Sequence, residues 1–199
     1  DVTGSFERAL LESSRVLAVR GRVVPATLAN LRLSAQFSDG TSVTGESGIR
    51  DRQGEITQIL INPLDAPGHP IAIKAIEDAE VVVIGPGSLY TSILPNLLVR
   101  DISDALKRTP ATTLYVCNVA TEIGETQGYT IAEHIEALRK FTFSEIADVV
   151  IGNESNLNLQ FDYAGAPVVD DGRSLSPARL ELRDVSDTEH PIRHSAEKL

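Results

Sequence analysis

A chain of 199 residues has the length of one ordinary domain and can bury a sizeable hydrophobic core. Hydrophobic residues make up 42% of it and charged residues 23%, with 14 Gly and 10 Pro spread along the sequence, which excludes collagen-like and low-complexity proteins. The formal net charge of −10 at pH 7 argues against nucleic acid as the main ligand, because its phosphates would be repelled, although a small basic patch is compatible with a nucleotide.

The cysteine count and the hydropathy indicate where the protein works. Cys117 is the only cysteine, so no disulfide can form within the chain. No apolar run is long enough for a secretory or membrane-spanning segment, and we therefore expect a cytoplasmic protein without membrane insertion. The sequence starts at Asp1 and contains no Met, so we interpret it as a trimmed piece whose missing part could carry further site residues.

The first part of the chain predicts a helix followed by an antiparallel hairpin. Apolar residues at helical spacing predict the helix over residues 6–19. Residues 31–38 alternate between apolar and polar, which predicts a half-buried strand, and Asp39-Gly40 is typical of a tight hairpin turn. We interpret residues 31–46 as a β-hairpin insertion.

From residue 56 onward, short apolar strands alternate with helical segments. Strands are predicted at residues 59–61, 80–84, 113–118 and 148–151, and helices at residues 72–79, 97–108 and 130–140. Because these strands are continuous apolar runs, they predict a doubly wound α/β fold, with a mostly parallel sheet covered by helices on both faces. We interpret residues 1–199 as a single α/β domain in which residues 159–199 form edge strands or a C-terminal extension.

The first candidate site is the turn of residues 85–92, which follows a predicted strand. In an open α/β sheet, ligands bind beyond the carboxyl ends of the strands. Glycines let the backbone approach an anion, and a helix start offers free N–H groups, so the turn predicts phosphate binding. Hydroxyls would bind the phosphate oxygens and a tyrosine would stack on a base or sugar; the candidates are Gly85, Gly87, Ser88, Tyr90, Thr91 and Ser92.

An ordinary strand-to-helix turn explains the same segment equally well. The turn lacks both the Lys of a P-loop and the third glycine of a dinucleotide-binding fingerprint, so a short glycine pattern alone does not establish a nucleotide site. Residues 152–155 also follow a predicted strand and carry small, hydrogen-bonding side chains.

The second candidate site is the polar, glycine-punctuated loop of residues 118–130. Asn118 and Thr121 are suited to reading a base or a sugar hydroxyl, and Glu125 to accepting hydrogen bonds from a ribose or hexose. The alternative is a long solvated loop in which Glu125 faces water.

Several side chains favour structural roles. Cys117 lies in an apolar strand and is interpreted as a core residue rather than a nucleophile. His134 lies on a helix face beside Ile135, without neighbouring metal ligands in the sequence. Thr130 and Glu133 have the spacing of a capping box, which predicts a helix start.

Arg193 and the carboxylate pattern leave the ligand chemistry open. Arg193 either folds back onto a phosphate or belongs to an exposed charged tail. No Asp-x-Asp pair occurs in the sequence, so the usual carboxylate pair for a divalent metal on a sugar diphosphate is missing and no metal site is predicted.

Two long motifs resemble a known family. Residues 83–98 (VIGPGSLYTSILPNLL), together with residues 115–119 and 124–130, closely resemble the YvcK-like gluconeogenesis factors of the CofD-like superfamily, whose other branch is 2-phospho-L-lactate transferase. Looser similarity spans nearly the whole chain, at residues 19–21, 39–40, 45–47 and 193–194.

The resemblance implies a Rossmann-like core that binds a UDP-sugar in the YvcK-like branch and a guanosine-linked phospholactate in the transferase branch. At matching positions it assigns to the phosphate end Gly85, Gly87, Ser88, Tyr90, Thr91, Ser92 and Asn96, with Arg193 approaching from the C-terminus. It assigns to the base and sugar pocket Asn118, Thr121, Gly124, Glu125, Thr126, Gly128 and Tyr129.

The sequence departs from the family pattern in two places. The family begins with a strand and a Gly-Gly-Gly-Thr-Gly turn that forms the first half of the nucleotide site, and this sequence lacks both. Ala120, Glu122 and Ile123 stand where the family has a bulkier residue and Gln-Pro.

The leading hypothesis is a UDP-sugar-binding regulatory protein, with UDP-N-acetylglucosamine as the expected ligand, that acts in cell shape and carbon metabolism and binds without turnover. The alternative is an enzyme of phosphoryl-linked group transfer, in which Mg²⁺ neutralises charge at the transferred phosphorus. A third hypothesis is a scaffold for partner proteins in cell-envelope regulation, and a homo-oligomer is compatible with each.

Overall fold

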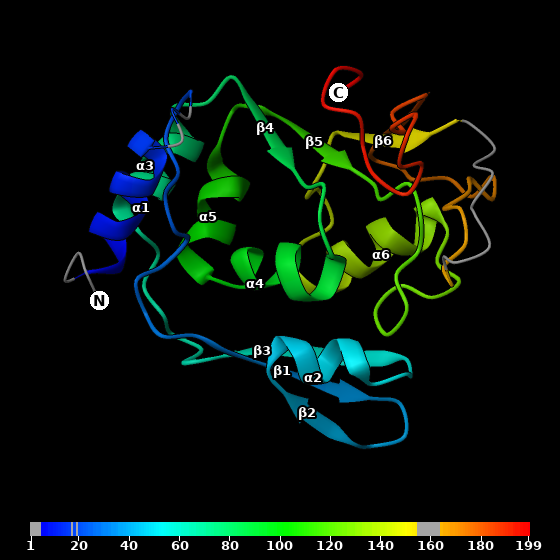
Figure 1. The fold of residues 1–199 in the computed structure, drawn as a ribbon, viewed down its shortest axis with the longest axis horizontal. Helices are drawn as coiled ribbons and strands as arrows, with labels where there is room; N and C mark the ends of the chain where they lie inside the picture. Colours follow the sequence, from blue (N-terminus) through cyan, green and yellow to red (C-terminus); the bar gives the residue numbers. More distant parts are fainter. Residues whose placement is uncertain (1–4, 17, 19, 155–163) are drawn as a thin grey trace.

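The structure is a computed structural model that describes residues 5–16, 18, 20–154 and 164–199 (Figure 1). It contains a four-stranded parallel sheet and a three-stranded antiparallel sheet, with helices between them. The predicted α/β class, with its parallel sheet and its antiparallel hairpin, is confirmed.

The antiparallel sheet grows out of the predicted hairpin. Strands β1 (Arg32–Phe37) and β2 (Ser42–Thr44) pair around Asp39-Gly40, and β3 (Ile56–Asn62) pairs with the other edge of β1. Alternating burial along β1 places Ala35 and Phe37 in the core, as the alternation of the sequence predicted. A short helix that the sequence did not predict, α2 (Glu46–Asp51), lies between β2 and β3.

The parallel sheet has the order β4-β5-β6-β7. Its strands are β4 (Val81–Ile84), β5 (Thr112–Val116), β6 (Val149–Asn153) and β7 (Arg179–Arg183). Helix α1 (Phe6–Val16) confirms most of the first predicted helix, whose residues 17 and 19 lie outside the described part. The remaining helical elements are α3 (Pro70–Glu77), the π-helical turn η1 (Leu89–Ile93), α4 (Leu94–Leu97), α5 (Arg100–Arg108) and α6 (Ile131–Phe141).

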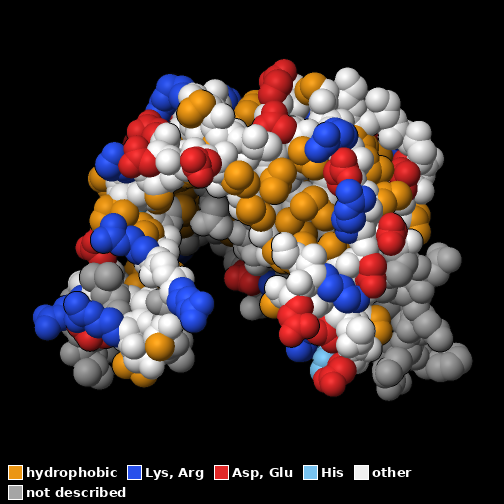
Figure 2. Space-filling view, turned by 90° about the horizontal axis from the view of Figure 1, so that it is seen from above, with side chains coloured by type: hydrophobic (Ala, Val, Ile, Leu, Met, Phe, Trp, Pro, Cys, Tyr) orange, Lys and Arg blue, Asp and Glu red, His pale blue; other side chains and the backbone are white. Residues whose placement is uncertain are grey.

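Helices of the described residues cover one face of the parallel sheet. Strands β4, β5 and β6 add in one direction, and right-handed crossovers then place their connecting helices on the same side. The side chains of Val81 and Val83, which point to the other side, are 52% and 55% exposed. Figure 2 shows hydrophobic side chains gathered on this face. The expectation of helices on both faces is therefore not met by the described residues.

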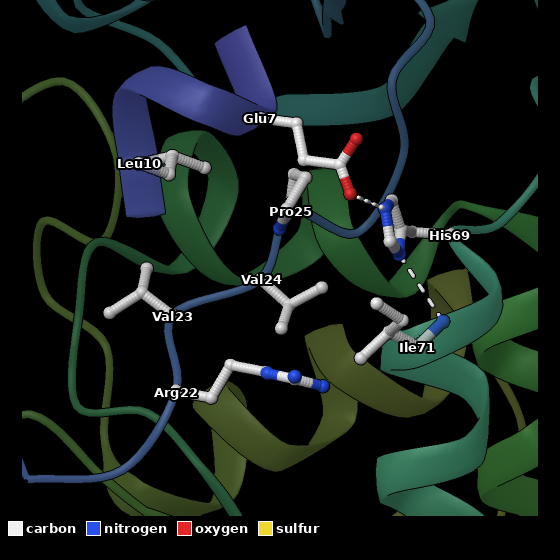
Figure 3. A pocket seen from close by; sticks show the side chains of 8 residues that line it. All are labelled: Glu7, Leu10, Arg22, Val23, Val24, Pro25, His69 and Ile71. Carbon is white, nitrogen blue, oxygen red and sulfur yellow. Dashed lines mark hydrogen bonds and ion pairs between the residues drawn. The ribbon is translucent and has the colours of Figure 1, made fainter. Parts of the chain in front are cut away.

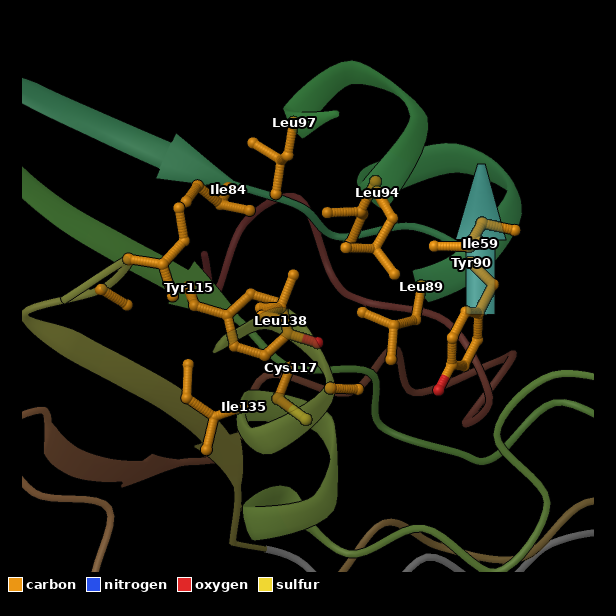
Figure 4. Close-up of a cluster of buried hydrophobic side chains, with 14 of the residues drawn as sticks. Ile59, Ile84, Leu89, Tyr90, Leu94, Leu97, Tyr115, Cys117, Ile135 and Leu138 are labelled. Carbon is orange, nitrogen blue, oxygen red and sulfur yellow. The ribbon is translucent and has the colours of Figure 1, made fainter. Parts of the chain in front are cut away.

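The core lies between the two sheets and holds the strand ends in place. Leu94 and Leu97 of α4 pack between Ile84 of the parallel sheet and Ile59 of β3 (Figure 4). Leu138 of α6 packs in the same cluster and is fully buried. Because the side chains of α4 contact both sheets, the turn that links β4 to α4 is held by the core on both sides.

The last residues fold back over the carboxyl ends of the parallel strands. The Val185 N–H donates to Asn153 Oδ1 at 3.0 Å, and a ring nitrogen of His194, Nε2, lies 3.0 Å from the carbonyl oxygen of Cys117. These contacts bring the C-terminal segment beside the carboxyl ends of β5 and β6. Among the described residues, no helix has the length and apolar character needed to cross a membrane.

Candidate functional site

A cleft of about 460 Å³ opens at the carboxyl edge of the parallel sheet, where ligands of open α/β folds bind. Its volume lies within the range of about 300–1,000 Å³ typical of small-molecule sites. Three segments that are far apart in the sequence line it: Pro86, Gly87 and Ser88; Asn118, Val119, Ala120 and Glu122; and Ile192, Arg193 and His194.

The first half of the 85–92 turn faces this cleft. Gly85 has a φ of +87°, and a Cβ there would lie 2.9 Å from the carbonyl oxygen of Val116, so the close approach of two strands requires glycine. Neither Gly87 nor Ser88 donates its backbone N–H to another residue in the described part of the chain. These two amides are therefore available to an anion in the cleft.

The second half of the turn is buried on an internal carboxylate. The N–H groups of Tyr90 and Thr91 donate to Glu125 Oε2 at 2.9 and 3.3 Å, and Thr91 Oγ1 donates to Glu125 Oε1 at 2.5 Å. The Glu125 side chain is 0% exposed, and this burial raises the pKa of its carboxyl. Glu125 is therefore neither solvated nor placed in the cleft.

The ring of Tyr90 is also enclosed. Its hydroxyl lies 2.8 Å from that of Tyr129, and its ring makes edge contacts with Tyr129 and Phe141. The residue is 1% exposed, and burial raises the pKa of its hydroxyl. The expectation that Tyr90 stacks on a base or sugar, and that the Thr91 hydroxyl binds phosphate, is corrected by these contacts, because both groups have partners inside the protein.

A second carboxylate, which the sequence did not predict as a site residue, lies in the cleft itself. Ser88 Oγ donates to Glu122 Oε2 at 2.7 Å, and Asn118 Nδ2 donates to Glu122 Oε1 at 2.9 Å. The backbone N–H of Glu122 donates to Thr126 Oγ1 at 3.0 Å, which fixes the loop behind it. A ligand phosphate must therefore compete with Glu122 for the Ser88 hydroxyl.

Arg193 lines the cleft from the C-terminal segment, as the family resemblance implied. Its backbone is held in a tight turn, because its carbonyl accepts from the Asp187 N–H and its own N–H donates to the His190 carbonyl, both at 2.8 Å. Burial lowers the pKa of the neighbouring His194, so that its imidazole is neutral at pH 7. Arg193 is therefore the permanent cation among the residues that line the cleft.

The other predicted site residues lie outside the cleft lining. Asn96 Nδ2 donates to the Ser92 carbonyl at 2.8 Å on the exposed side of α4. Thr121 is 2% exposed and its hydroxyl accepts from the Ala166 N–H at 2.9 Å. The backbone conformations of Gly124 and Gly128, with φ of +82° and +80°, shape the loop below the cleft.

The residues interpreted as structural are confirmed in that role. Thr130 and Glu133 form a capping box at the start of α6. His134 is fully buried, its Nδ1 lies 2.8 Å from the Thr130 carbonyl, and burial lowers its pKa to about 4. Cys117 is fully buried and its thiol pKa is raised to about 12, which excludes a reactive thiolate.

A small pocket beside α1 is too narrow for a nucleotide. Its volume is about 70 Å³, and Glu7, Val24 and His69 are among its lining residues (Figure 3). The Ile71 N–H donates to His69 Nδ1 at 3.2 Å, which caps α3, while His69 Nε2 lies 3.5 Å from Glu7 Oε1. We interpret this pocket as the joint between α1 and α3. Within the described ranges, no group of three His, Cys, Asp or Glu side chains is arranged to hold a metal ion.

Residues 1–182 match the family model described as 2-phospho-L-lactate transferase CofD. A gluconeogenesis factor from Halalkalibacterium halodurans is 38% identical over 208 residues, which cover all of this chain and 64% of that protein. The gluconeogenesis factor of Bacillus subtilis is also 38% identical, over 207 residues covering all of this chain and 65% of that protein. The chain thus spans less than two thirds of the length of either relative.

A solved structure shows the same architecture. The crystal structure of a UPF0052 family protein from Bacillus halodurans superposes with a TM-score of 0.90 at 36% sequence identity. The match covers 99% of this chain and 66% of that one.

Proposed function

Since the chain belongs to the CofD family and its relatives include gluconeogenesis factors, we propose that its cleft binds a nucleotide sugar, with UDP-N-acetylglucosamine as the leading candidate. The diphosphate would lie between the free amides of Gly87 and Ser88 and the guanidinium of Arg193. Asn118 and Glu122 are suited to the hydroxyl or N–H groups of the sugar and base.

The observation that carries this proposal is the convergence of three segments on one cleft. A glycine turn after β4, a polar loop after β5 and a C-terminal arginine meet around the same volume. Each supplies a different part of nucleotide-sugar chemistry, namely backbone donors, a donor and acceptor pair, and a cation. Packing of the core does not by itself require an exposed arginine in the same cleft as two amides that have no partner among the described residues.

We extend the proposal to a regulatory role in carbon metabolism and cell shape, in the cytoplasm and with partner proteins that read the bound state. The relatives named gluconeogenesis factors support the first of these roles. Glu122 is the carboxylate of the cleft lining, and its two oxygens already accept hydrogen bonds from Ser88 and Asn118. Binding without turnover is the simplest activity for such a lining.

A transferase is the second candidate, because the matching family model carries the description of 2-phospho-L-lactate transferase. Its family chemistry implies Mg²⁺ beside the phosphates. The described residues do not fit a protein-held Mg²⁺ site, since no cluster of ligands is present among them and both Glu122 oxygens accept hydrogen bonds from the protein. We therefore derive no step through a metal ion.

Calorimetric titration of the chain with UDP-N-acetylglucosamine, UDP and GDP, each with and without Mg²⁺, tests the proposal. Metal-independent uridine binding supports the regulator, whereas guanosine binding that requires Mg²⁺, with product formation, supports the transferase. Replacing Arg193 by Gln should weaken UDP-N-acetylglucosamine about 10- to 100-fold, because a charge-assisted hydrogen bond is lost. The melting temperature should not change, since the Arg193 side chain is exposed. Equal affinity of R193Q and the unmodified chain would remove Arg193 from the site.

A further inference from the structure

Arg50 connects the small antiparallel sheet to the candidate site. It lies in the last turn of α2, and its guanidinium reaches the 85–92 turn, with Nη2 3.3 Å from Ser88 Oγ and Nε 3.3 Å from Thr91 Oγ1. The same Nε lies 3.4 Å from Glu125 Oε1, and Nη2 lies 3.0 Å from Glu46 Oε1. One planar cation therefore touches both the open and the buried half of the turn.

The buried carboxylate makes this contact more than a surface ion pair. Glu125 is 0% exposed at its side chain, whereas the Arg50 side chain is 46% exposed and keeps part of its hydration. A buried carboxylate is costly unless it has hydrogen bonds and a counter-charge. The Tyr90 and Thr91 groups supply the hydrogen bonds, and Arg50 is the cation that the structure brings to it.

Backbone packing fixes the position of Arg50 relative to the loop that carries Glu125. A Cβ on Gly124 would lie 2.0 Å from the Arg50 carbonyl oxygen, so the two backbones are in direct contact. Because α2 is anchored in this way, its arginine reaches the turn from a fixed point rather than from a free surface helix.

We propose that Arg50 is a positioning residue for the phosphate-binding turn. Its guanidinium holds Ser88 and Thr91 at a fixed separation and balances the charge of Glu125, so that the amides of Gly87 and Ser88 face the cleft. The inference rests on the proposed function, because a bound anion is what the positioned turn would serve. With this role for Arg50, the unit formed by β1, β2, α2 and β3 contributes a residue that shapes the binding site.

The test compares Arg50→Gln and Arg50→Lys with Arg52→Gln in the 199-residue chain. Arg52 lies two residues further on, contacts Asp39 and the ring of Phe37, and touches neither half of the turn, which makes R52Q the matched control. Each variant is titrated with UDP-N-acetylglucosamine and followed by thermal unfolding. Amide hydrogen exchange at Tyr90 and Thr91 is measured without ligand, because these N–H groups donate to Glu125.

We expect R50Q to lower the affinity about tenfold and to speed exchange at both amides. R50Q should also lower the melting temperature more than R52Q does, because buried Glu125 loses its counter-charge. R50K should lose affinity to a similar extent, since an ammonium group cannot bridge Ser88 and Thr91 as a planar fork does. Unchanged affinity and exchange in R50Q, full affinity in R50K, or equal losses in R52Q would each overturn the positioning role. If the unmodified chain binds no nucleotide, the proposed function fails, and the exchange rates alone decide for or against Arg50.

Discussion

The two halves of the 85–92 turn both carry hydroxyl side chains, but they lie in opposite environments. Gly87 and Ser88 line the cleft, whereas Tyr90 and Thr91 are 1% and 7% exposed and donate to Glu125. The chain thus supplies its own anion to one half and leaves the other half open. A glycine- and hydroxyl-rich turn therefore indicates an anion site only after internal carboxylates have been accounted for.

The largest effect should come from a substitution in the loop that carries Glu125, because this loop places the carboxylate against the buried half of the turn. Gly124→Ala should destabilise the fold by about 3 kcal/mol, because its φ is +82° and its Cβ would lie 2.0 Å from the Arg50 carbonyl oxygen. Urea denaturation measures the loss. Gly128→Ala is the control: its φ is +80°, but nothing lies within 4 Å of its Cβ, so it should lose only about 1 kcal/mol. Equal losses would contradict the close contact.

The pH dependence of stability tests whether Glu125 is buried in the folded chain. Burial raises the pKa of Glu125 above its ordinary value of 4.5, so between that value and the raised pKa the folded chain binds more protons than the unfolded chain. The contribution of Glu125 to stability should therefore fall as pH rises through this window. The free energy of unfolding, measured from pH 4.5 to 7, should fall more steeply with pH for the unmodified chain than for Glu125→Gln. Parallel curves would show that Glu125 does not titrate differently in the two states.

The smallest effects should come from removing the hydroxyls of Ser88 and Thr91, one in each half of the turn. The two substitutions should affect different properties, ligand affinity for Ser88 and stability for Thr91. Thr91→Ala should lower the free energy of unfolding by about 1 kcal/mol, because the Thr91 hydroxyl donates to buried Glu125. Ser88→Ala should change stability less and weaken UDP-N-acetylglucosamine about fivefold, since Ser88 lines the cleft. Calorimetry and thermal unfolding of both variants provide the check. Identical profiles would mean that the turn acts as one unit.

Much of the fold could be predicted because its signals are local. Continuous valine and isoleucine runs marked β4 and β6, the alternation along residues 31–38 marked β1, and Asp39-Gly40 marked the hairpin turn. Helix α2 was missed because it has only six residues, includes Gly48, and starts after Gly45 without a side-chain cap.

The site was predicted only in part because its chemistry depends on long-range contacts. The position of the turn beyond β4 follows from topology, and Gly87, Ser88, Asn118 and Arg193 line the cleft. The sequence offers no local sign that Glu125 would satisfy amides of the turn that lies 34 to 35 residues earlier. Glu122 had one available signal, its spacing of four residues after Asn118 in a loop beyond a strand.

The half-exposed valines of β4 affect how the chain interacts with apolar surfaces. Val81 and Val83 form an exposed apolar strip that offers water no hydrogen bonds, which favours adsorption to apolar surfaces such as phenyl resins. Their side chains point away from the core layer that anchors the 85–92 turn. Adsorption through this strip and ligand binding in the cleft are therefore separate properties. Replacing the two valines by charged residues would reduce adsorption without changing any residue that lines the cleft.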